Sequence, residues 1–160
     1  MIGGLTPGGL EFVLGNLRDA DEAEMRATVY QGSAQATAKL IASIPGPKWE
    51  ARADSDGEPV AVGGFVPTWP GVGSGWMVGT DRWDEVIVEV TRAMKKHILP
   101  TLDARGVHRI ECRAMAANVA AIRWLELVGF KREAVIAQFG QGREDFILCA
   151  RVTGNAPRHH

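Results

Sequence analysis

The sequence predicts a single domain of the α/β class, of the α+β type, with the element order β α α β β β α β α β β. The length of 160 residues fits one domain with one sizeable core. Hydrophobic residues make up 46% and charged residues 23%, a globular composition that excludes disorder for the bulk of the chain. Short apolar runs alternate with segments of helical periodicity. We expect this domain to span residues 10–152, after a flexible lead-in of residues 1–9 and before a flexible tail of residues 153–160.

The first third of the domain is predicted to be mainly helical. Leu10–Leu14 is a short apolar run, which predicts the first strand. Asp19 and Glu22 have the spacing of a capping box, so we expect a helix to begin near Ala20 and to run toward Tyr30. Ser33–Ile44 carries apolar residues at helical spacing and predicts a second helix, which a Pro-Gly-Pro run ends.

The middle of the chain is predicted to be β structure. Trp49–Ala53 and Pro59–Val66 are predicted strands, and the Asp56-Gly57 dipeptide between them is typical of a tight hairpin. Pro67–Gly75 holds prolines and glycines, so we expect a wide loop there. Trp76–Thr80 is the next predicted strand.

The last third contains the clearest helix. It is expected to begin near Asp84, because Val86, Val90, Met94 and Ile98 form one stripe at steps of four residues. Pro100 is expected to kink or restart it. The remaining predicted elements are the strand Val107–Ala114, the helix opened by Asn118 and closed by Gly129, and the strands Lys131–Phe139 and Asp145–Val152.

Charge and cysteine content exclude several classes of protein. Lys and Arg total 18 and Asp and Glu total 19, so no global basic field would attract nucleic acid or an anionic membrane. Cys112 and Cys149 are too few for a disulfide framework or a four-ligand zinc site, so we expect core thiols in a reducing compartment and no metal. No apolar run reaches 18 residues and the N-terminus has no signal-peptide pattern, which predicts a cytoplasmic protein. The terminal Arg158-His159-His160 is either a natural tail or a truncated tag.

One local motif resembles a known family. Residues 118–130 read Asn-Val-Ala-Ala-Ile-Arg-Trp-Leu-Glu-Leu-Val-Gly-Phe, which resembles the final helix and turn of the GNAT family of N-acyltransferases. Asp56-Gly57 followed by Pro59–Gly64 is similar to the second hairpin of that family. Together with the element order, the resemblance implies a central, mixed, mostly antiparallel twisted sheet of about seven strands with helices on both faces.

The resemblance also implies a reaction and a cofactor site. In that family two central parallel strands diverge at their C-terminal ends, and acetyl-CoA lies in the gap and supplies an acetyl group to a primary amine. The diverging strands would be Trp76–Thr80 and Val107–Ala114, and the pyrophosphate would lie on the helix that begins near Asp84. The residues that would bind acetyl-CoA are Met77, Val78, Gly79, Thr80, Arg82, Asn118 and Arg123.

Two positions depart from the family pattern. The glycine-rich phosphate loop is absent between Thr80 and Asp84, where Trp83 adds bulk and acidic residues add negative charge. Leu125 occupies the place of a tyrosine that protonates the leaving thiolate. With these departures, the sequence resembles the acetyltransferase-like proteins of tailed phages. This implies an alternative, a catalytically silent module in phage particle structure or assembly, bound to structural proteins or to copies of itself, in the host cytoplasm or the virion.

Some residues have two interpretations from the sequence alone. Glu111 is a candidate general base for the amine, or else one member of an ion pair with Arg109 or Arg113. The clustered tryptophans Trp69, Trp76 and Trp83 would form either a stacking platform or part of the core. Asn118 would either contact the cofactor or only cap its helix. Glycine is in excess, at 19 residues, and the sequence assigns most of these to turns and loops.

Overall fold

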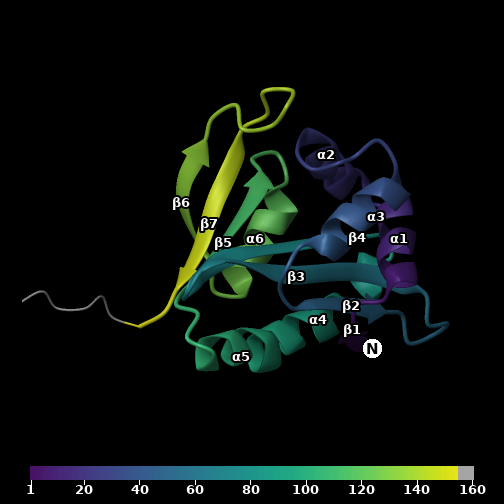
Figure 1. The fold of residues 1–160 in the computed structure, drawn as a ribbon, viewed down its shortest axis with the longest axis horizontal. Helices are drawn as coiled ribbons and strands as arrows, with labels where there is room; N and C mark the ends of the chain where they lie inside the picture. Colours follow the sequence, from purple (N-terminus) through teal and green to yellow (C-terminus); the bar gives the residue numbers. More distant parts are fainter. Residues whose placement is uncertain (155–160) are drawn as a thin grey trace, which may run out of the picture.

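The computed structural model describes residues 1–154 and contains one seven-stranded sheet with helices on both faces (Figure 1). The strand order is β1-β2-β3-β4-β5-β7-β6, and only the β4–β5 pair is parallel. The strands are β1 (Ile2–Gly4), β2 (Lys48–Arg52), β3 (Pro59–Trp69), β4 (Val72–Gly79), β5 (Arg109–Met115), β6 (Lys131–Ile136) and β7 (Phe146–Val152). The α-helices are α1 (Pro7–Gly15), α2 (Asp19–Ala27), α3 (Ala34–Ser43), α4 (Ile87–Ala93), α5 (Leu99–Ala104) and α6 (Val119–Leu127). The predicted fold class and the mixed, mostly antiparallel sheet are confirmed.

The helices divide into two layers. Helices α1–α3 pack on one face of β3 and β4, where Leu10, Val13 and Met25 meet Val62 and Val78. Helices α4–α6 cover the opposite face, where they bury residues of β2, β3, β5 and β7. We call these the α1–α3 face and the α4–α6 face. In Figure 1 the α1–α3 group lies on one side of the long strands β3 and β4, and α4 with α5 lies on the other.

The N-terminal predictions are corrected. Residues 10–14 belong to helix α1 rather than to a strand, because the side chain of Thr6 accepts the Gly9 N–H and Pro7 takes the first helical turn. Residues 2–4 are not a loose lead-in, because they pair as β1 with β2. At the other end, the Thr153 N–H donates to the His108 carbonyl at 2.9 Å, and residues 155–160 of the predicted tail lie outside the described residues.

Two further helix predictions differ in accuracy. Helix α3 is confirmed, with Ser33 as the cap that accepts the Ala36 N–H at 3.0 Å. Helix α2 is confirmed as a helix, but Asp19 lies inside its first turn and Arg18 is the cap residue, without a side-chain capping bond. It also ends at Ala27, before the expected end at Tyr30.

The predicted wide loop at residues 67–75 is wrong. Strand β3 continues to Trp69 and β4 begins at Val72, joined by a tight turn that contains Gly71 at φ +85°. Proline is tolerated there because it lies near the end of the strand. The glycines of this hairpin do not loosen it, and they provide room for aromatic rings. A Cβ on Gly73 would lie 2.4 Å from the Phe65 ring, and one on Gly63 would lie 2.4 Å from the Trp49 ring.

The long helical segment after β4 is interrupted where the sequence places a proline. Helix α4 passes into a π-helical turn over Met94–Ile98 before α5 begins, and Pro100 lies in the first turn of α5. The proline has no N–H to donate to the preceding turn, which fits the wider hydrogen-bond spacing just before it. No helix in residues 1–154 is long and apolar enough to cross a membrane.

Candidate functional site

The two central strands separate after a short paired stretch. β4 and β5 pair in parallel only at Val72–Ser74 against Arg109–Glu111, and beyond these three pairs the strands diverge. Each strand keeps its outer neighbour, since β4 pairs with β3 along its length and β5 pairs with β7. The expected gap between the C-terminal parts of β4 and β5 is therefore present.

Only one residue of the predicted cofactor strand offers free backbone groups to this gap. Alternate residues of a strand direct their backbone groups to opposite edges, and Thr80 donates its N–H to Val60 of β3 at 2.8 Å. Val78 shares that orientation. Gly79 faces the gap, but its N–H donates to Asp21 at 2.7 Å and its carbonyl accepts the Arg18 N–H at 3.0 Å. Among the described residues, no group forms a hydrogen bond with the gap-facing N–H or C=O of Met77.

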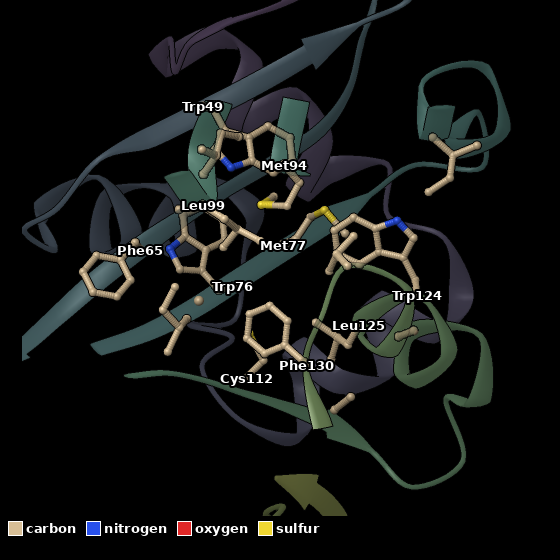
Figure 2. A pocket seen from close by; sticks show the side chains of 18 of the residues that line it. Trp49, Phe65, Trp76, Met77, Met94, Leu99, Cys112, Trp124, Leu125 and Phe130 are labelled. Atoms are coloured by element: carbon tan, nitrogen blue, oxygen red, sulfur yellow. The ribbon is translucent and has the colours of Figure 1, made fainter. Parts of the chain in front are cut away.

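A cavity of about 860 Å³ passes through the gap. From the α4–α6 face it is lined by Trp49, Met94 and Trp124, and from the α1–α3 face by Trp76 and Glu24. Figure 2 shows the Met77 side chain near the middle of the labelled aromatic and apolar side chains. The volume suits a small-molecule ligand, and a ligand on one face can meet a ligand on the other through the split in the sheet.

The cavity surface is mainly apolar. Besides the residues just named, Phe65, Leu99, Leu125 and Phe130 contribute to it (Figure 2). Cys112 also lines the cavity, and burial raises the pKa of its thiol to about 12. The thiol is therefore protonated at neutral pH and is a poor nucleophile. This part of the site can hold an uncharged chain by van der Waals contact and by hydrogen bonds at Met77.

The connection between β4 and α4 is strongly acidic. The guanidinium of Arg82 lies 2.6 Å from a carboxylate oxygen of Glu85 and 2.9 Å from one of Asp56, and it also pairs with Glu58. Hydrogen bonds from Arg82 hold the pKa of Glu85 and of Asp56 below their usual values, so these carboxylates stay ionised. Arg82 is thus surrounded by three carboxylates, and the cluster as a whole carries negative charge.

Trp83 fills the space next to Arg82. Its ring meets the Trp124 ring edge to face, with centroids 6.1 Å apart, and the guanidinium of Arg18 lies 5.1 Å from its centroid. Trp124 in turn donates its Nε1–H to the hydroxyl of Thr91 at 2.9 Å, which fixes α6 against α4. The indoles join the two elements on either side of the gap, next to the start of α4.

Helix α2 presents the buried carboxylate of Asp21 and the half-buried carboxylate of Glu24 to the open ends of the diverging strands. Asp21 accepts the Gly79 N–H at the end of β4, and Glu24 accepts the Met115 N–H at the end of β5 at 2.9 Å. Burial raises the pKa of both carboxyls, although the hydrogen bonds they accept oppose the rise. Asp21 also pairs with Arg18 at 2.9 Å. Glu24 has no cation in contact among the described residues, and it lines the cavity.

The other predicted site residues lie in different surroundings. Asn118 caps α6 by accepting the Ala121 N–H at 3.3 Å and donates its amide to Glu24 at 2.9 Å. Arg123 lines the cavity from α6 and is exposed. Thr80 is buried, and its hydroxyl accepts the Arg82 N–H at 3.3 Å. The contacts of Asn118 and Thr80 are structural, which leaves their contact with a cofactor as a prediction.

Glu111, the predicted general base, lies outside the cavity lining. Its carboxylate is 3.0 Å from Arg109 and 3.3 Å from Arg113, and Arg109 also pairs with Glu133. This arrangement is the ion-pair alternative that the sequence left open. Glu24 was missed by sequence reasoning, because a glutamate in an acidic helix is indistinguishable from a solvated one until the packing of α2 against β5 and α6 is known.

The clustered tryptophans are predicted to form either a stacking platform or part of the core, and their positions differ from one residue to the next. Trp76 and Trp83 line the cavity, and Trp69 is 63% exposed at the β3–β4 turn. They do not form one stacking platform. Within residues 1–154, no group of three or more His, Cys, Asp or Glu side chains is placed to hold a metal ion.

Comparison with known proteins gives the fold. No protein-family model matches the chain, and no curated protein matches it. Among solved structures, a ribosomal-protein-alanine N-acetyltransferase from Brucella melitensis aligns with a TM-score of 0.72 at 15% identity, covering 96% of this chain and 99% of the other. The ribosomal-protein-S18-alanine N-acetyltransferase from Escherichia coli aligns with a TM-score of 0.64 at 21% identity, covering 100% and 97%.

A third similar structure acts on a different kind of amine. A spermidine N-acetyltransferase from Vibrio cholerae aligns with a TM-score of 0.69 at 13% identity, covering 95% of this chain and 94% of the other. A GNAT-family acetyltransferase from Streptococcus pneumoniae aligns with a TM-score of 0.65 over 96% of the chain. The chain therefore has the fold of the GNAT-family acetyltransferases over nearly its whole length.

Proposed function

We propose that the protein is an N-acyltransferase that moves an acetyl group from acetyl-CoA to a primary amine. The observation that carries the proposal is the divergence of β4 and β5 after three pairs, with a cavity that is lined by residues from both faces of the sheet. The thioester would enter from the α4–α6 face, with its amide groups beside the free backbone groups of Met77. The amine would enter from the α1–α3 face, beside Trp76 and Glu24.

Glu24 is the residue best placed to activate the amine. A protonated amine has no lone pair, so it must lose a proton before its nitrogen attacks the thioester carbonyl carbon. Glu24 lies in the cavity lining, and burial raises its pKa, which makes its carboxylate a stronger base than a solvated glutamate. The C–N bond then forms and the C–S bond breaks. Leu125 has no proton to give, so the departing thiolate takes its proton from solvent.

Thermal unfolding with millimolar acetyl-CoA tests the proposal. A ligand present at 100 times its dissociation constant stabilises the native state by about 2.7 kcal/mol, which raises Tm measurably. Thiol release in the presence of spermidine, or of a peptide with an N-terminal alanine, then tests transfer to an amine. These acceptors are the kinds on which the similar structures act. An unchanged Tm at millimolar acetyl-CoA would contradict the proposal.

A second candidate is a catalytically silent module of the same fold that acts in phage particle structure or assembly. The observation that favours it is the filled β4–α4 connection, where carboxylates neutralise Arg82 and Trp83 packs on Trp124. Such a protein would associate with structural proteins or with copies of itself. A solution mass well above 17.3 kDa, together with no response to acetyl-CoA, would favour this candidate.

A further inference from the structure

We propose that the donor site recognises the acyl-pantetheine arm of its thioester and offers the nucleotide diphosphate no favourable contact at the connection from β4 to α4. The inference rests on the proposed function and specifies its substrate class as pantetheinyl thioesters in general, whether or not a nucleotide is attached. Two independent parts of the structure carry it.

The first is the part of the cleft that suits the arm. A pantetheine arm is an uncharged chain with two amide groups, so it needs apolar contact and a few hydrogen bonds. The apolar cavity lining around Trp49, Met94 and Phe130 supplies the contact. The gap-facing N–H and C=O of Met77 supply one donor and one acceptor beyond the last β4–β5 pair.

The second is the connection from β4 to α4, which is acidic and whose arginine is already paired. A diphosphate carries negative charge, and it would meet Asp84 and Glu85 there. The one cation on this connection, Arg82, already pairs with Asp56, Glu58 and Glu85. To contact a phosphate, Arg82 would have to leave these carboxylates uncompensated beside the ligand. Trp83 packs edge to face on Trp124, and both indoles line the cavity beside this connection.

Titration calorimetry with two donors tests the inference. We expect acetyl-pantetheine and acetyl-CoA to bind with dissociation constants within about threefold of each other, and 3′,5′-ADP not to compete with either. Acetyl-CoA binding at least tenfold more tightly than acetyl-pantetheine would overturn the inference and leave the proposed function standing. Failure of both thioesters to bind would overturn the proposed function itself.

Release of Arg82 gives a gain-of-binding test. The variant Asp56→Asn/Glu58→Gln/Glu85→Gln removes the surrounding negative charge at partly exposed side chains. We expect it to bind acetyl-CoA at least fivefold more tightly than the unmodified protein does, with affinity for acetyl-pantetheine unchanged within twofold. Equal changes for the two donors would contradict the inference.

A pair of single variants controls for net charge and for folding. Glu85→Gln alone should increase acetyl-CoA affinity by a smaller factor, about twofold, because two carboxylates still hold Arg82. Glu11→Gln removes the same charge from exposed α1 and should change neither affinity. An equal gain from Glu11→Gln would show that overall charge, not the Arg82 cluster, controls binding.

Discussion

The two ends of the cleft differ in what occupies them. The inner end, around Met77, is apolar and keeps free backbone groups on an open strand edge. The outer end, at the connection from β4 to α4, is lined by the Trp83–Trp124 pair, and an ion-pair cluster around Arg82 lies on the same connection outside the cavity lining. The backbone of a fold can thus preserve the path for a thioester arm while side chains at one connection remove the site for its phosphates.

The largest effect is expected at Gly63 of β3, which lies against the cavity-lining Trp49. Gly63→Val should lower the free energy of unfolding by about 3 kcal/mol, because overpacking strains a dense interior. A Cβ at this position would lie 2.4 Å from the Trp49 ring and 2.9 Å from the Trp76 carbonyl. Urea denaturation measures the change. Gly3→Val is the matched strand control, since a Cβ there meets nothing within 4 Å. Similar losses in both variants would refute the packing account.

The next effect concerns transfer rather than stability. Glu24→Gln should reduce kcat by about 100-fold, because the amide cannot accept the proton of the amine, while its oxygen can still accept the Met115 N–H. The KM for the thioester should change little. The unmodified protein should lose activity as the pH falls through the raised pKa of Glu24, and the variant should lack this limb. Glu111→Gln is the comparison, and a greater loss there than in Glu24→Gln would return the role to Glu111.

The carboxyl group of Glu24 should also make the stability of the protein depend on pH. Burial raises the pKa of Glu24 in the folded state above its unfolded value. Its contribution to stability is therefore fully present below the unfolded pKa and is lost as the pH rises through the folded one. Relative to the unmodified protein, Glu24→Gln should gain stability as the pH rises from the usual glutamate pKa, about 4.3, to the raised pKa of Glu24 in the folded protein. Denaturation at several pH values measures this, and a difference that does not vary with pH would count against it.

The smallest effect is expected at the hydrogen bond between Trp124 and Thr91, which joins α6 to α4. Trp124→Phe removes the hydrogen bond to Thr91 and should cost about 1 kcal/mol of stability. The edge-to-face contact with Trp83 is largely kept by a phenyl ring. Combining this change with Thr91→Val should cost less than the sum of the two single changes, because the partners share one bond. Strict additivity in this double-mutant cycle would show that the bond contributes nothing.

Sequence reasoning predicted the fold better than the site. The periodicity of Val86 and Val90 and the cap at Asn118 located helices correctly, because local signals determine them. Leu10–Leu14 is predicted as a strand but belongs to α1, since a five-residue segment with four apolar residues fits either structure and the Thr6-Pro7 start favours the helix. The gap between β4 and β5 came from the family resemblance. The roles of Glu24 and Arg82 depend on partners far along the chain, at Met115 and at Asp56, which no local pattern reveals.

The central claim is that a thioester arm lies along β4 at Met77 and that its nucleotide does not reach Arg82. Nuclear magnetic resonance titration of the ¹⁵N-labelled protein tests this directly. We predict that acetyl-pantetheine and acetyl-CoA both shift the backbone amide of Met77 by the same amount, and that neither shifts the Nε–H of Arg82 or the indole N–H of Trp83. A shift of Arg82 and Trp83 with acetyl-CoA alone, or an unmoved Met77 amide with both donors, would contradict the claim.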